Sequence, residues 1–365
     1  MNETLAREAV VGCILGTAVG DALGLPYEGV SASRAPRMLG PPDRYRFFFG
    51  RGMISDDTEH TCMVAGSLIE ALADANVERE IEFFTRRLAS RLRWWILALP
   101  AGVGKATARS GIRLWLGFKP ENAGVFSAGN GPAMRAAIFG ASIDDVPRML
   151  RFVRASSRLT HTDPKAEYGA TAVALAARES KQSRIEGNTG VDANRWLEGV
   201  VEAIGGDGSE LTDLLRRATT SVQAHESTIA FSKNLGLEKG VTGYTYHTVP
   251  VAIHAWLSHP SDFGKAITTV IQCGGDADTT AAIVGGIVGA GVGSEGIPCE
   301  LLGGIWEWPR SVNWMRTLGE SLVEVTEGNP SKPLARLNPF ALLTRNLFFL
   351  TVVLFHGFRR LAPPY

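Results

Sequence analysis

Residues 276–291 read DADTTAAIVGGIVGAG, with two aspartates and two threonines at the head of an apolar run that is rich in glycine. The apolar part predicts a helix over 279–291. Gly285, Gly286 and Gly289 would give this helix a face without side chains. In a lipid setting such a face indicates helix dimerisation, but here we expect it to allow close packing in the protein core. That packing would hold the acidic residues at the head of the helix rigidly.

A second acidic cluster, Ser55-Asp56-Asp57-Thr58, heads another helix-forming stretch. Four aspartates from the two clusters, placed in one cleft, would repel one another and raise their pKa values unless cations were present. Hard divalent ions prefer oxygen ligands from carboxylates and hydroxyls, and two such ions would balance four carboxylates. The sequence therefore predicts a cleft with a binuclear metal site.

Helix capping is the alternative interpretation of each cluster. Asp56 followed by Glu59 resembles a capping box, and Asp276 or Asp278 could cap an apolar helix. For one cluster alone the two interpretations are evenly matched. A cap needs one side chain, however, whereas each cluster offers two carboxylates and a hydroxyl, and this redundancy favours metal binding.

Composition narrows the class of protein. The 365 residues include 37 basic and 37 acidic side chains, so no net field attracts nucleic acid or an anionic membrane, and we expect no nucleic-acid partner. We see neither a repeat nor a linker, so we predict one domain over 1–365. Cys13, Cys62 and Cys273 lie in apolar patterns, which indicates reduced thiols in the core.

Helical periodicity dominates and strand-like alternation is scarce, so we predict a compact all-α fold. In the first segment Val10, Ile14 and Thr17 lie on one face of a predicted helix, and Asp21 is the last residue on that face. Further helices are expected over 57–75, 78–99, 133–139, 144–159, 164–180, 192–204, 210–225, 248–256, 263–272 and 279–291.

The N-terminal segment lacks a signal-peptide pattern, and we expect a cytoplasmic protein. Near the other end, residues 347–355 read LFFLTVVLF, and thirteen residues separate Arg345 from Arg359. About 20 apolar residues are needed to span a bilayer. We therefore expect a buried terminal helix and no transmembrane segment, with contact to a membrane surface as the alternative.

Three other segments are candidates for ligand binding. Gly129-Asn130-Gly131-Pro132 precedes a helix, and its amides could hold a pyrophosphate, although an ordinary turn explains it equally well. His161 lies two residues before Asp163, which we expect to cap the next helix, but a lone histidine is more often structural than a ligand contact. Tyr244 and Tyr246 could stack on a purine or belong to the core.

Taken in order along the chain, these pieces resemble the ADP-ribosylglycohydrolase family. The resemblance covers about 8–298 and rests on Gly20-Asp21-Ala22-Leu23-Gly24 with Tyr27-Glu28, the two acidic clusters, Gly129-Asn130-Gly131 and His161-x-Asp163-Pro164. It implies an all-α fold, a pair of Mg²⁺ or Mn²⁺ ions, and cleavage of the glycosidic bond between ADP-ribose and a modified residue. Residues 299–365 would form a C-terminal helical extension.

The resemblance also implies roles for single residues. Ser55, Asp56 and Asp57 would hold one metal, Asp276 and Thr279 the other, and Asp278 would bridge them. The family usually has Thr where Ser55 stands, and the change keeps the hydroxyl. The catalytic residues would be Glu28, near the scissile bond, and Asp57. The residues matching the family's substrate-binding segments are Gly129, Asn130, Gly131, His161 and Tyr244.

By this resemblance the protein removes ADP-ribose from modified protein side chains, with arginine expected. It could reverse an endogenous modification, or one made by an ADP-ribosyltransferase toxin. The alternative is a non-enzymatic protein that binds ADP-ribosylated partners or blocks such a transferase. The complete acidic set and Glu28 favour the enzyme.

Overall fold

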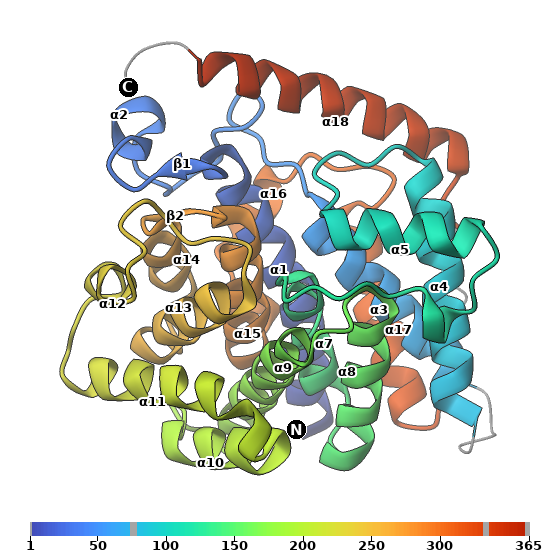
Figure 1. The fold of residues 1–365 in the computed structure, drawn as a ribbon, viewed down its shortest axis with the longest axis horizontal. Coiled ribbons are helices and arrows are strands. Elements are labelled where there is room, and N and C mark those ends of the chain that lie inside the picture. The colour runs from blue at the N-terminus through green and yellow to red at the C-terminus, as the bar shows by residue number, and fades with distance from the viewer. Residues whose placement is uncertain (1, 74–78, 331–335, 362–365) are drawn as a thin grey trace.

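The computed structural model describes residues 2–73, 79–330 and 336–361. The predicted helix end at 75 and helix start at 78 lie outside these ranges. The described chain is almost entirely helical, as predicted, with one small two-stranded ribbon (Figure 1). The helices are α1 (Asn2–Gly24), α2 (Ala35–Leu39), α3 (Asp56–Leu72), α4 (Glu80–Leu97), α5 (Lys105–Trp115), α6 (Gly131–Met134), α7 (Ala137–Ser142), α8 (Val146–Thr160), α9 (Pro164–Ile185), α10 (Ala193–Ile204), α11 (Ser209–Gln223), α12 (Thr228–Asn234), α13 (Thr245–Ser258), α14 (Phe263–Ile271), α15 (Ala277–Val292), α16 (Cys299–Gly304), α17 (Val312–Thr326) and α18 (Pro339–Arg359). The strands are β1 (Val30–Ser31) and β2 (Gly274–Gly275), and the 3₁₀ turns are η1 (Leu25–Tyr27), η3 (Pro120–Asn122), η4 (Gly206–Gly208) and η5 (Ser294–Gly296).

The antiparallel helices α1 and α15 form the centre of the fold and meet through small residues. Gly12, Gly16, Gly20 and Gly24 of α1 face Gly289, Gly285, Ala281 and Ala277 of α15 in turn. A Cβ atom added at Gly16 would lie 2.1 Å from the carbonyl oxygen of Gly285. The close packing predicted for the glycine-rich helix is therefore confirmed, and α1 supplies the matching glycine row.

This contact predicts a large effect of a single methyl group. Gly16→Ala is expected to destabilise the protein by about 1–3 kcal/mol, because the backbones must separate to admit the Cβ atom. Gly199→Ala is the matched control, since a Cβ atom at Gly199 meets nothing within 4 Å. Gly199 lies in the interior of α10, where replacing glycine by alanine should raise the free energy of unfolding by about 0.5–1 kcal/mol. Denaturant unfolding of both variants measures the difference, and equal stabilities would contradict the packing argument.

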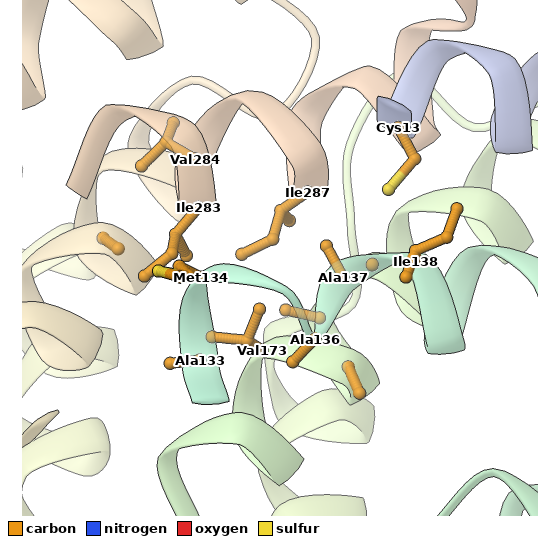
Figure 2. Close-up of a cluster of buried hydrophobic side chains, with 14 of the residues drawn as sticks. Cys13, Ala133, Met134, Ala136, Ala137, Ile138, Val173, Ile283, Val284 and Ile287 are labelled. Atoms are coloured by element: carbon orange, nitrogen blue, oxygen red, sulfur yellow. The ribbon is translucent and has the colours of Figure 1, made fainter. Parts of the chain in front are cut away.

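Around the central pair the core is built from apolar side chains of successive helices. Figure 2 shows Cys13 of α1, Ile283 and Ile287 of α15 and Ala137 of α7 in one buried cluster. Cys13, Cys62 and Cys273 are free and buried, as predicted, whereas Cys299 is free and exposed.

The helix predicted over 133–139 is wrong, because the chain breaks there into α6 and α7. The break lies at Arg135, whose buried guanidinium contacts Ser156 Oγ, Thr160 Oγ1 and His60 Nδ1 at 3.1, 2.7 and 2.8 Å. Such a set of partners is visible only in the folded structure. The sequence patterns do not predict α2, α5 or α12, whereas α16 and α17 lie within the helical extension expected over 299–365.

The terminal helix α18 lies along one edge of the molecule (Figure 1) and is not buried as expected. One face packs on the body through Phe349 and Val352, but Phe340 is 81% and Phe358 70% exposed. By length and composition two described helical segments could cross a membrane, Glu3–Tyr27 and α18. The first is wholly inside the protein, whereas 28% of the second is buried.

Candidate active site

The two acidic clusters meet because α3 and α15 both begin beside the C-terminal half of α1. Ser55 precedes α3, and its Oγ both accepts from the Asp57 amide and donates to Asp57 Oδ2, at 3.4 and 3.1 Å. Thr279 Oγ1 on α15 donates to the same Asp57 oxygen at 3.3 Å. Residues separated by more than two hundred positions thus share one carboxylate, so capping alone does not describe the clusters.

The carboxylates of Asp57 and Asp278 are buried, those of Asp56 and Asp276 are partly buried, and all four repel one another. Burial raises the pKa of Asp57 well above its usual range, and the charges of Asp56, Asp21 and Asp276 raise it further. Burial likewise raises the pKa of Asp278, and the charge of Glu28 raises it further. Unpaired buried carboxylates cost several kcal/mol, so this arrangement favours a counter-charge.

Three carboxylate oxygen atoms show where that counter-charge would lie. Asp21 Oδ1, Asp57 Oδ1 and Asp278 Oδ1 are buried without a hydrogen-bond partner. Their neighbours Ser55 and Thr279 add hydroxyl oxygens, so the donor set fits hard divalent ions. Among the described residues no three His, Cys, Asp or Glu side chains already have metal-ligand spacing, and the metal pair remains a prediction.

Asp21 is a site residue that the predicted set omitted. It is fully buried at the end of the α1 stripe, and its Oδ2 accepts from the Ser55 amide at 2.8 Å and from Thr58 Oγ1 at 2.5 Å. Burial raises the pKa of Asp21 to about 6. Asp21 therefore fixes the start of α3, and the signal for it was an acidic residue on an otherwise apolar helix stripe.

Glu28 reaches the site through the small β ribbon. Val30 of β1 pairs with Gly275 of β2, and the Gly29 amide donates to the Gly275 carbonyl at 2.7 Å. Glu28 thus precedes one strand while Asp276 follows the other. Burial raises the pKa of the half-buried Glu28, the Asp276 charge raises it further, and Arg360 lowers it. A carboxyl with a raised pKa beside a reacting bond suits acid or base catalysis.

A cleft of about 560 Å³ opens over these residues, a size typical of small-molecule sites. The predicted residues that line it are Glu28, Ser55, Asp56, Gly129, Asn130, Gly131, His161, Asp276, Asp278 and Thr279.

The Gly129–Gly131 segment forms one wall of the cleft and is tied to the second acidic cluster. Asn130 Nδ2 donates to Asp276 Oδ2 at 2.7 Å. Cβ atoms at Gly129 and Gly131 would lie 3.1 and 2.9 Å from the His161 imidazole, so the two glycines flank that ring. Burial lowers the pKa of His161 to about 3, which keeps the ring neutral.

Two predicted site residues do not line the cleft. Asp57 lies beneath it, bonded to Ser55 and Thr279. Tyr244 pairs through its backbone with Gly129, but its hydroxyl accepts from Lys165 Nζ at 3.0 Å.

The remaining wall comes from segments that the sequence did not place at the site. Lys105 and Thr107 at the start of α5 line the cleft, as do Phe349 and Val353 of α18. The pair Gly104-Lys105 has no phosphate-loop spacing, and nothing in the apolar pattern of α18 indicates a ligand. The packing of α18 on Leu25 of η1 brings Phe349 and Val353 to the cleft.

The raised pKa values predict how metal binding depends on pH. A carboxyl whose pKa is higher in the folded than in the unfolded chain favours folding when protonated, and this contribution is lost as pH rises through the folded value. Protons therefore compete with metal for Asp57 and Asp278, because burial raises the pKa of both carboxyls well above the usual range.

Mg²⁺ should accordingly raise the melting temperature more at pH 7.5 than at pH 5. Thermal unfolding with and without Mg²⁺, at matched ionic strength, measures the two increments. Buried neutral histidines affect both samples equally and cancel in this comparison. Equal increments at the two pH values would contradict metal binding by these carboxylates.

Comparison with known proteins identifies the family. The sequence model of the ADP-ribosylglycohydrolase family matches residues 2–332, which includes α17 and ends before α18. An uncharacterized protein of Archaeoglobus fulgidus is 30% identical over 76% of this chain and 86% of its own length. The ADP-ribosyl-[dinitrogen reductase] glycohydrolase of Rhodospirillum rubrum is 28% identical over 82% and 90%.

Two further relatives agree with this match. The ADP-ribosylhydrolase ARH3 of Gallus gallus is 26% identical over 79% of this chain and 86% of that protein. A solved structure described as an ADP-ribosylglycohydrolase-related protein complex superposes with a TM-score of 0.63 at 25% identity, covering 88% of this chain and 99% of that one. The chain therefore belongs to the ADP-ribosylglycohydrolase family.

Proposed function

We propose that this protein hydrolyses the bond between ADP-ribose and an arginine side chain of a modified protein. The observation that carries the proposal is the meeting of Glu28 with the two acidic clusters in one cleft. In the reaction the bond between the anomeric carbon and the side-chain nitrogen breaks. Water supplies a hydroxyl to the carbon, and its proton passes to the departing nitrogen.

The side chains divide this work between them. Ser55, Asp56 and Asp57 would hold one Mg²⁺ or Mn²⁺ ion, Asp276 and Thr279 the second, and Asp278 both. Bound there, such ions orient hydroxyls and water and offset developing charge. Glu28 moves the proton, because its raised pKa suits both acid and base roles. The Gly129–Gly131 segment and His161 would bind the diphosphate and ribose, and Tyr244 would lie near the nucleotide.

Arginine is proposed as the acceptor from the sequence resemblance to ADP-ribosylarginine hydrolases. One relative, from Rhodospirillum rubrum, carries dinitrogen reductase in its name as the ADP-ribosylated protein. The ADP-ribosylated substrate of this chain would enter the cleft beside α18, whose Phe349 and Val353 form part of the wall.

Release of ADP-ribose from a panel of substrates tests the proposal. The panel holds arginine-, serine- and DNA-linked ADP-ribose, each assayed with Mg²⁺ and with EDTA. We expect release from the arginine linkage, lost in EDTA. Release from another linkage alone would reassign the acceptor. No metal-dependent release from any member would favour the alternative, a protein that binds ADP-ribosylated partners without cleaving them.

A further inference from the structure

Helix α18 buries polar side chains beside Phe349 and Val352 and exposes a row of large apolar side chains. Its inward face carries Arg345, Asn346 and His356, which are all buried. Its outward face carries Phe340, Leu347, Leu354, Phe355 and Phe358, which are 48–81% exposed. A soluble helix usually turns its polar side chains outward. A contiguous exposed apolar face on this scale marks an interaction site.

The apolar surface continues onto a neighbouring turn. Phe48 stacks on Trp306 and meets Phe348 of α18 edge-on, with ring centroids 5.2 Å apart in both pairs. The next residue, Phe49, is 94% exposed and has a φ of 46°. A bulky side chain rarely adopts this left-handed conformation, so the turn holds an aromatic ring outward beside α18.

Basic side chains predominate around this surface. Segments 34–51 and 336–361 together contain eight arginines besides the buried Arg345, and Asp43 is their single acidic residue. The two segments touch, since Arg359 donates to the Met38 carbonyl at 3.4 Å and Arg34 to the Arg360 carbonyl at 2.5 Å. The chain is neutral in total, but these two segments give it a locally basic face.

From these observations we propose that the outer face of α18, with the Phe48–Phe49 turn, docks the protein on the surface of a bilayer containing anionic phospholipid. The aromatic and leucine side chains would enter the interface while the surrounding arginines meet lipid phosphates. Apolar burial combined with basic charge is the usual basis of such binding.

Contacts on the inner face distinguish lying on the bilayer from crossing it. Arg345 Nε and Nη2 donate to the two carboxylate oxygens of Glu307 at 2.7 and 2.6 Å, and Nη2 also donates to the Ile54 carbonyl at 2.5 Å. Asn346 Nδ2 donates to the Ala98 carbonyl at 2.8 Å. A spanning helix would lose these bonds and leave Glu307 buried without its partner, at a cost of several kcal/mol.

Charge also argues against a second copy of this chain as the occupant. A two-fold interface brings the same patch of both copies together. Here it would place one arginine-rich face against another, and like charges across an interface oppose association. Anionic lipid has the complementary charge.

Flotation of the full-length protein with vesicles tests the proposal. One set contains phosphatidylglycerol and phosphatidylcholine, and the other contains phosphatidylcholine alone. We expect binding to the anionic set, weakened by added salt. Replacing Phe355 and Phe358 together by Ser should lower the partition coefficient at least about tenfold. Arg44→Gln with Arg359→Gln should lower it on anionic vesicles by several-fold.

The matched control is Phe126→Ser, which removes an 80% exposed phenylalanine from the segment between η3 and α6. It should bind vesicles as the unmodified protein does, and thermal unfolding of every variant verifies the fold. Failure of the unmodified protein to bind anionic vesicles, or equal binding by the Phe355/Phe358 variant, would overturn the proposal. So would a lipid-free dimer that this variant dissociates, because the face would then join two copies. None of these outcomes depends on which ADP-ribose linkage is cleaved.

Discussion

Asp57→Asn should abolish metal-dependent hydrolysis while making the metal-free protein more stable. The expected loss of kcat is on the order of 10²–10³-fold, the range seen when one charged group of a preorganised site is removed. Stability should rise because Asp57 Oδ1 is buried without a hydrogen-bond partner and Asp56, Asp21 and Asp276 crowd the same carboxylate. Turnover with Mg²⁺ and thermal unfolding in EDTA measure the two effects.

The opposite effects on turnover and on stability distinguish a metal ligand from a structural residue. A carboxylate that only held the fold together would lose stability on conversion to the amide. Asp207→Asn, an exposed position on η4, is the control and should change neither property. Full turnover by the Asp57 variant, or a lower melting temperature in EDTA, would show that this carboxylate has been misassigned.

Glu28→Gln should lower kcat by about 10²–10⁴-fold, the usual contribution of a positioned acid or base. The isosteric amide keeps the half-buried shape but cannot transfer the proton. The pH–rate profile should also lose the limb that reports Glu28, whose pKa burial and Asp276 raise. Steady-state kinetics across the pH range measure both effects.

The Mg²⁺-induced gain in melting temperature should survive in the Glu28 variant, which distinguishes it from the Asp57 variant. Glu198→Gln on α10 provides a control at an exposed glutamate. An unchanged kcat would remove Glu28 from the chemistry. A lost Mg²⁺ response would make it a ligand instead of the acid or base.

The helical fold could be predicted from the sequence because most segments with a helical apolar period do form helices in the structure. The segment predicted over 192–204 forms α10 (Ala193–Ile204), where an Asp192 cap and an apolar stripe agree. The prediction failed where long-range contacts decide the backbone. Arg135 interrupts a helical pattern because its buried partners lie on α3 and α8.

The candidate site could likewise be predicted only where short-range sequence motifs determine it. Both acidic clusters and Glu28 could be located from short motifs, because each needs only a few neighbouring residues. The sequence could not predict that the two clusters and Glu28 meet, because this depends on the glycine contact between α1 and α15 and on the Val30–Gly275 pairing. Phe349 and Val353 were missed for a related reason, because α18 reaches the cleft through contacts such as the bond between His356 and the Phe47 carbonyl.

The central claim is that carboxylates from the heads of α3 and α15 hold a pair of divalent ions. Anomalous diffraction from crystals grown with Mn²⁺ tests it most directly. The account predicts two peaks about 3.5–4 Å apart, bounded by Asp56 and Asp57 on one side and by Asp276 and Asp278 on the other. A map with no peak between these residues, or with manganese only elsewhere on the protein, would contradict the claim.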